Sequence, residues 1–198
     1  LDLLLDYGRG LMAWQLGDEK LGNLIKQRLD LHLLGSYAIT DWAELAFDLP
    51  MTAWQSDGFA DLQAATGFAT ARPNSWGLGD VRAIGKVRLL SELQSAPLTA
   101  ALLFELRLPT GADQSFLGER GLLLAPRAVI ERTLFERLRL AFEAGYRARS
   151  SPGRFLNLYV GDELTLGLAG SWALPQGLLE RWTLFGELLA ATPARAPF

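Results

Sequence analysis

The segment from Lys26 to Thr40 alternates between apolar and polar residues almost without interruption. Successive side chains of an extended strand point to opposite sides of its sheet, so such a segment has two different faces. One face carries Leu29, Leu31, Leu33, Tyr37 and Ile39, and the other carries Lys26, Arg28, Asp30, His32, Ser36 and Thr40. The pattern therefore predicts an amphipathic β-strand whose polar face is charged.

The same alternation recurs along the chain and predicts nine strands. They are expected at residues 1–7, 26–40, 43–52, 79–90, 98–108, 122–133, 138–148, within 157–172, and at 182–188. A helical alternative exists around 128–148, where Leu134, Leu138 and Phe142 recur at a spacing of four. The charged residues of that region would surround a helix but share one face of a strand. Short alternating segments separated by Gly and Pro indicate a β-sandwich or a β-barrel.

The predicted connections alternate in length. Those after the first, third, fifth and seventh strands are long, as in 8–25 and 54–78, whereas the others are short. Outer-membrane barrels have this asymmetry, and most of the predicted strands reach the roughly 9–11 residues that a tilted membrane-spanning strand needs. Aromatic residues near strand ends are suited to the membrane interfaces. They are Tyr7, Tyr37, Trp42, Trp54, Trp76, Tyr146, Trp172 and Trp182.

These features predict an all-β fold, an antiparallel up-and-down transmembrane β-barrel. A soluble barrel turns its apolar face inward, so alternation alone does not distinguish the two. The alternative is therefore a soluble β-barrel or sandwich that binds an apolar ligand on its leucine face.

Composition narrows the classes of function. The 198 residues include 19 basic and 22 acidic side chains, a balance that argues against nucleic acid as a partner. Cysteine is absent, which excludes disulfides and thiolate chemistry. No run of about 18 apolar residues occurs, so a transmembrane helix is not predicted.

The whole chain, residues 1–198, is predicted to be one barrel domain. Single-chain bacterial barrels have an even number of strands, and the sequence supplies nine. We therefore expect the barrel to be truncated at the C-terminus of this chain and to belong to a larger, even-numbered one.

The charged faces of the strands supply the candidate functional residues, which are expected to line a lumen as a pore or a plug. They are Lys26, Arg28, Asp30, His32, Glu44, Asp48, Arg82, Lys86, Arg88, Glu105, Arg107, Arg127, Glu131, Arg139, Glu143, Arg147 and Glu187. Opposite charges on neighbouring strands are expected to pair, for example Arg107 with Glu131 and Glu44 with Arg28. Such pairs either fill a narrow barrel or tune the selectivity of a water-filled path.

No catalytic, cofactor or metal site is predicted. His32 is the single histidine, so neither a Ser-His-Asp triad nor a histidine-based metal site has its usual partners. The interpretation is a non-catalytic outer-membrane barrel that anchors an envelope protein or passes small solutes.

Three short motifs resemble known outer-membrane barrels. They are Gly77-Leu78-Gly79-Asp80-Val81-Arg82, Leu106-Arg107-Leu108-Pro109-Thr110-Gly111 and Asn157-Leu158-Tyr159-Val160-Gly161-Asp162-Glu163. The first two are similar to the signature of barrels related to the meta-pathway phenol-degradation transporter family. All three, with their spacing, resemble the N-terminal barrel of large OmpA-family proteins.

In that family, a barrel of about a dozen strands precedes calcium-binding repeats and a peptidoglycan-binding domain. The resemblance implies the outer membrane of a Gram-negative bacterium, with the lipid bilayer as partner and lipopolysaccharide as a further candidate. It implies peptidoglycan only through the domain that this sequence lacks.

Overall fold

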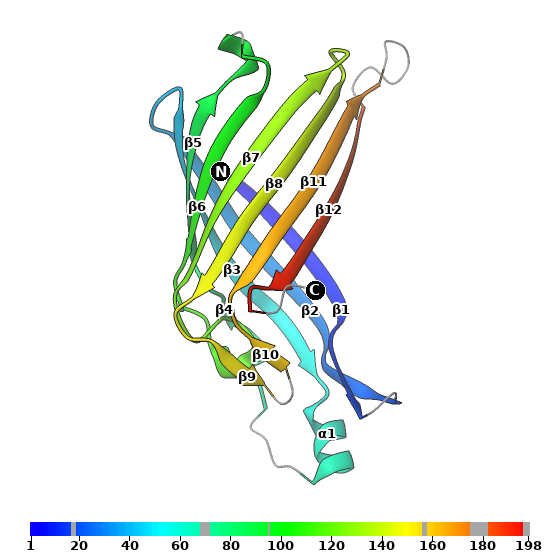
Figure 1. Cartoon of the computed structure of the whole chain (residues 1–198). Helices are drawn as coiled ribbons and strands as arrows, with labels where there is room; N and C mark the ends of the chain where they lie inside the picture. Colours follow the sequence, from blue (N-terminus) through cyan, green and yellow to red (C-terminus); the bar gives the residue numbers. More distant parts are fainter. Residues whose placement is uncertain (17–18, 68–71, 95, 156–157, 175–181, 196–198) are drawn as a thin grey trace. The chain divides into compact units, whose positions relative to one another are not determined.

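The chain is antiparallel β-structure along most of its length (Figure 1). The computed structural model describes all residues except 17–18, 68–71, 95, 156–157, 175–181 and 196–198. Its strands are β1 (Asp2–Leu16), β2 (Glu19–Ala38), β3 (Ala43–Asp57), β4 (Gly77–Leu78), β5 (Arg82–Leu90), β6 (Thr99–Arg107), β7 (Leu123–Leu134), β8 (Leu138–Arg149), β9 (Gly153–Phe155), β10 (Leu158–Val160), β11 (Glu163–Ala173) and β12 (Thr183–Pro193). The helices are α1 (Phe59–Thr66), η1 (Glu92–Gln94) and η2 (Asp113–Ser115).

Strand order in the main sheet follows the chain. The order is β1-β2-β3-β5-β6-β7-β8-β11-β12, with β4 paired to β3 and a separate β9–β10 hairpin. The predicted all-β, antiparallel, up-and-down fold is confirmed, and each predicted strand corresponds to one strand of this order. None of the helices in the described part of the chain is long and apolar enough to cross a membrane.

The residues group into two compact units. Unit 1 contains Leu1–Ser36, Ala46–Arg82 and Arg107–Gly121, and unit 2 contains Tyr37–Leu45, Ala83–Leu106 and Leu122–Phe198.

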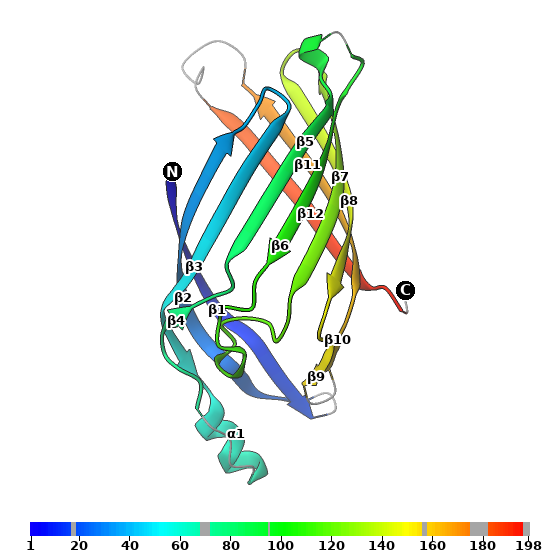
Figure 2. The ribbon, with the colours of Figure 1, turned by 90° about the vertical axis from the view of Figure 1, so that its left-hand side faces the viewer.

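In unit 1, two predicted connections are wrong. Residues 8–16 and 19–25 continue the first two strands as a long hairpin, from Asp2 opposite Leu34 to Leu16 opposite Glu19 (Figure 2). Register shifts interrupt this hairpin, and Gly10 has a φ of 63°. A β-bulge breaks the period of two, which explains why the sequence pattern there indicated a loop.

The second wrong connection is 54–78. Strand β3 continues to Asp57, and α1 follows it directly in Figure 1. Gly67 ends the helix in a left-handed conformation, with its backbone N–H donating to the Gln63 carbonyl. A helix of eight residues is too short for its periodicity to stand out in the sequence.

Unit 1 also has a small apolar core. Leu24, Ile25, Phe59 and Leu117 are buried, and the rings of Phe59 and Phe116 lie 6.0 Å apart, centroid to centroid. Phe116 and Leu117 belong to the connection between β6 and β7, which the alternation predicted only as a polar loop. This connection therefore packs against the strands and α1 of the same unit.

Unit 2 is built mainly from β7, β8, β11 and β12, which run side by side in both views (Figures 1 and 2). The predicted turn between β7 and β8 is confirmed. Phe135 and Glu136 have φ values of 51° and 61°, as the two-residue turns that suit twisted hairpins require. The predicted break after β8 is more structured than expected, because residues 153–155 and 158–160 pair as β9 and β10.

The two faces of β11 differ in exposure. On β11, Leu164, Leu166, Leu168 and Trp172 are all exposed, whereas Glu163 and Thr165 on the opposite face are only partly accessible. The apolar row of β11 therefore faces the surroundings, the reverse of a water-soluble sheet with a buried apolar face.

Candidate functional site

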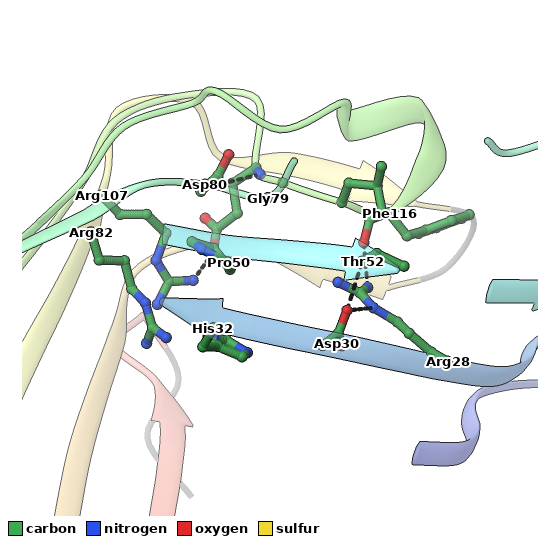
Figure 3. A pocket seen from close by; sticks show the side chains of 13 residues that line it. Arg28, Asp30, His32, Pro50, Thr52, Gly79, Asp80, Arg82, Arg107 and Phe116 are labelled. Carbon is green, nitrogen blue, oxygen red and sulfur yellow. Dashed lines mark hydrogen bonds and ion pairs between the residues drawn. The ribbon is translucent and has the colours of Figure 1, made fainter. Parts of the chain in front are cut away.

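In unit 1, residues of β2 and β3, the first residue of β5 and the last residue of β6 surround a cavity of about 350 Å³ (Figure 3). Five of the predicted lumen residues, His32 among them, lie on its wall, together with residues of the β6–β7 connection. The lining residues are Arg28, Asp30, His32, Pro50, Thr52, Gly79, Asp80, Arg82, Arg107, Phe116, Leu117, Gly118 and Glu119. The structure thus brings Arg28, Asp30, His32, Arg82 and Arg107 together around one cavity.

Asp48 lies behind this wall and is only 3% exposed. Its Oδ1 lies 3.0 Å from His32 Nδ1, and its Oδ2 accepts a hydrogen bond from Arg82 Nη2. A buried carboxylate is stable only when it is paired and hydrogen-bonded. Asp48 therefore fixes the orientation of both the imidazole ring and the guanidinium group that face the cavity.

Asp30 ties the two strands β2 and β3 to the β6–β7 connection. It accepts hydrogen bonds from Arg28 Nε at 2.7 Å and from Thr52 Oγ1 at 2.6 Å. The same arginine donates from Nη1 to the Phe116 carbonyl at 2.8 Å. A chain of charge-assisted hydrogen bonds therefore holds the connection against the strand face.

Asp80 holds the same connection from the other side. Its carboxylate accepts hydrogen bonds from the backbone N–H groups of Gly111, at 2.9 Å, and Glu119, at 2.7 Å. Gly118 permits this approach, because a Cβ atom there would clash with Asp80 Oδ1. Arg107 Nη1 lies 3.7 Å from Glu119 Oε1, a separation of an ion pair rather than of a short hydrogen bond.

The Ser115 end of the connection is anchored by polar groups. Gln55 Nε2 donates to the Ser115 carbonyl at 2.9 Å, and the Asn74 backbone N–H donates to Ser115 Oγ at 2.9 Å. Both Gln55 and Ser115 are buried. One wall of the cavity is thus a fixed segment of the fold.

Unit 2 has its own charged face, built on β6, β7, β8 and β11. Arg127 lies 3.3 Å from Glu105 and 3.5 Å from Glu143, and Arg147 lies 2.7 Å from Glu163. A second cavity of about 250 Å³ borders Glu105, Arg127, Glu143 and Arg147. Here side chains of neighbouring strands form ion pairs with one another.

The remaining predicted residues lie outside both cavities. Lys86 pairs with Glu44 at 3.5 Å, and Arg139 pairs with Glu131 at 3.3 Å. Arg88 donates to the Asp41 carbonyl at the β2–β3 turn, Lys26 pairs with Asp61 of α1 at 2.7 Å, and Glu187 is exposed on β12. The partners found for Arg107, Glu131, Glu44 and Arg28 differ from the two predicted pairs, because the actual stagger of the strands could not be derived from the sequence.

Several cavity residues were missing from the prediction. Thr52 and Asp80 lie on the polar sides of alternating segments, so the pattern itself could have identified them. Glu119, Phe116 and Leu117 lie in the β6–β7 connection, where no periodic signal exists. Their position depends on a long-range fold of the loop rather than on strand alternation.

A polar corner lies between β8 and β11. Asp162 accepts hydrogen bonds from the Arg149 backbone N–H and from the Tyr146 hydroxyl, both at 2.8 Å. These bonds, the backbone one most strongly, hold the pKa of the Asp162 carboxyl below its ordinary value.

Among the residues that the structure describes, no group of three or more His, Cys, Asp or Glu side chains is arranged to hold a metal ion.

A scan against protein-family models and a search of curated proteins found no match for this chain.

Proposed function

We propose that this chain is an outer-membrane β-barrel of a Gram-negative bacterium that acts, without catalysis, as an envelope anchor or a passive channel for small solutes. The observation that carries the proposal is the inverted distribution of side chains. Large apolar residues of the strands are exposed, whereas Asp48 and Glu105 are buried in ion pairs.

The exposed apolar rows extend over several neighbouring strands. In unit 2, Leu140 and Phe142 of β8 continue the row formed by Leu166 and Leu168 of β11, because Leu166 pairs with Ala144 and Leu168 with Phe142. Continuous apolar surfaces of this kind are rare on soluble monomers and are typical of surfaces that contact a membrane or a partner. A lipid bilayer is the partner that accommodates such a surface on successive strands.

Strand length and aromatic positions give further support. Strands β5, β6, β7, β8, β11 and β12 contain 9, 9, 12, 12, 11 and 11 residues. About 9–11 residues suffice for a tilted strand to cross the hydrocarbon layer. All eight aromatic residues predicted for the interfaces are exposed.

The resemblance of the three motifs to OmpA-family barrels fits the same proposal. We infer the lipid bilayer as the direct partner and lipopolysaccharide as a second one. In this family, peptidoglycan would be bound only by a separate domain.

Flotation with lipid vesicles tests the proposal. The full chain is refolded in the presence of phosphatidylcholine vesicles, washed with alkaline carbonate and centrifuged through a density gradient. We expect folded protein to float with the lipid and to resist the wash. A folded protein that stays in the aqueous fraction without detergent would contradict the membrane assignment and support the soluble alternative.

A second measurement separates the anchor from the channel. Ion pairs such as Arg127 with Glu105 and Glu143 occupy space on the charged face and favour a filled interior. Resolvable single-channel currents in planar bilayers would support a channel. Their absence from protein that floats with vesicles would support an anchor.

A further inference from the structure

We propose that the cavity of unit 1 binds a small organic carboxylate, with the guanidinium groups of Arg82 and Arg107 as its main ligands. This inference rests on the proposed function, because the solute would reach the charged face from a water-filled interior. It adds a substrate class and a site to a barrel otherwise described only as an anchor or passive channel.

The first argument is the convergence of donors. Arg82, Arg107 and His32 all line this one cavity, which Figure 3 shows from close by. A guanidinium group carries five N–H donors in a planar fork that matches the two oxygens of a carboxylate. Arg82 donates to Asp48 from Nη2, so that carboxylate does not use the other N–H groups of the guanidinium.

The second argument concerns three acidic groups on or next to this wall. Asp30, Asp48 and Asp80 each accept two hydrogen bonds from protein donors. These three carboxylates are thereby engaged within the fold, and Glu119, a further acid of the lining, lies 3.7 Å from Arg107 Nη1. Arg82 has N–H donors beyond the one that Asp48 accepts, and such donors favour an oxyanion over an ammonium group as a ligand.

The third argument is the apolar part of the lining. Pro50, Phe116 and Leu117 contribute to the wall, and the cavity volume of about 350 Å³ lies at the lower end of the range for small-molecule sites. An acid with a short aliphatic chain could place its carboxylate on the arginines and its methylene groups against these residues. A spherical anion such as chloride could use neither the fork nor the apolar surface.

Isothermal titration calorimetry on the full chain in detergent micelles tests this site. Butyrate is the probe, and butyramide is the control because it has nearly the same shape without the charge. We expect butyrate to bind roughly tenfold more tightly than butyramide, since only the former makes charge-assisted, bidentate hydrogen bonds. Equal binding of the two, or binding of neither, would overturn the proposal.

Arginine-to-lysine variants locate the site. Arg82→Lys and Arg107→Lys keep the charge but lose the planar fork, so each is expected to weaken butyrate binding by roughly tenfold. Arg139→Lys is the matched control, because Arg139 is 61% exposed and pairs with Glu131 outside both cavities. If Arg82→Lys fails to refold, as judged by circular dichroism, Arg107→Lys still decides the matter. Full butyrate affinity in the folded Arg107→Lys variant, or an equal loss in Arg139→Lys, would contradict the assignment.

The titration and the flotation experiment can fail separately. Protein that floats with vesicles but does not distinguish butyrate from butyramide retains the proposed function and loses this inference. Protein that distinguishes them but remains in the aqueous fraction loses the membrane assignment and retains the carboxylate site.

Discussion

The same alternating pattern gives the two units differently covered charged faces. In unit 2, a short turn at Phe135 and Glu136 joins β7 to β8, and the charged face is an array of ion pairs between strand side chains, such as Arg127 with Glu143. In unit 1, a long connection packs on the charged face and is held there by Asp30 and Asp80 through Arg28 and backbone N–H groups. Alternation alone therefore does not determine whether a charged face meets solvent or protein.

Because of this difference, the proposed binding site lies in unit 1. A fixed connection converts one part of a strand face into a walled cavity, whereas strand-to-strand ion pairs mostly satisfy one another. Equivalent substitutions in the two units test whether these structural features also contribute differently to the free energy of unfolding.

The largest contrast is expected for ion pairs. Asp48→Ala leaves Arg82 without its buried partner in unit 1 and should lower the free energy of unfolding by about 3–5 kcal/mol. Glu131→Ala removes the partner of the exposed Arg139 in unit 2 and should cost no more than about 1 kcal/mol. Urea titration in lipid vesicles, followed by tryptophan fluorescence, measures both. Equal costs would mean that the charged faces of the two units are equally hydrated.

A smaller effect is expected on the outward face of unit 2. Leu168 is 54% exposed and lies between Phe142 and Leu188 on the neighbouring strands. If this row contacts lipid near the bilayer midplane, Leu168→Arg should cost about 2–4 kcal/mol.

Ala169→Arg is the control for that substitution. Ala169 lies on the other face of β11, opposite Glu187 of β12, so an arginine there gains a carboxylate neighbour and should cost less than about 1 kcal/mol. Both variants are measured by the same urea titration. Similar small costs for the two would indicate that water, not lipid, surrounds Leu168.

Truncating a buried side chain in the β6–β7 connection of unit 1 should lower the free energy of unfolding by a smaller amount. Leu117 is 5% exposed, so Leu117→Ala removes buried methyl groups and should cost about 2 kcal/mol, the lower end for such changes because an adjoining cavity allows relaxation. Leu93, in η1 of unit 2, is 92% exposed, so Leu93→Ala should change the free energy of unfolding by less than about 0.5 kcal/mol. A Leu117→Ala variant as stable as the parent would show that the connection is not part of the folded core.

Strand positions in unit 2 could be predicted from the sequence because local alternation matches the actual ladders. The row Leu164, Leu166 and Leu168 is continuous, and the Phe135–Glu136 turn joins β7 to β8, the strand that pairs with β11. The first hairpin of unit 1 was predicted too short, because a bulge near Gly10 shifts the side-chain period.

The cavity was predictable only in part for a related reason. Arg28, Asp30, His32 and Arg82 share polar faces that alternation identifies directly. Phe116, Leu117 and Glu119 reach the same space through a loop whose position depends on hydrogen bonds to residues distant in sequence, such as Asp80. Contacts of that range leave no periodic signal.

The smallest effect is expected at the polar corner of unit 2. The folded state holds the pKa of Asp162 below its ordinary value, so the carboxylate stabilises the fold above that value and loses this contribution as the pH falls through the lowered pKa. The melting temperature of the parent chain should therefore exceed that of Asp162→Asn at neutral pH, and the difference should shrink as the pH falls below about 4. Because Asp162 is partly accessible to solvent, the difference should be the smallest of the series and should weaken in high salt. Thermal melts of both proteins at several pH values give the comparison. A difference that grew toward acidic pH would mean that Asp162 does not act as an ionised acceptor for Arg149 and Tyr146.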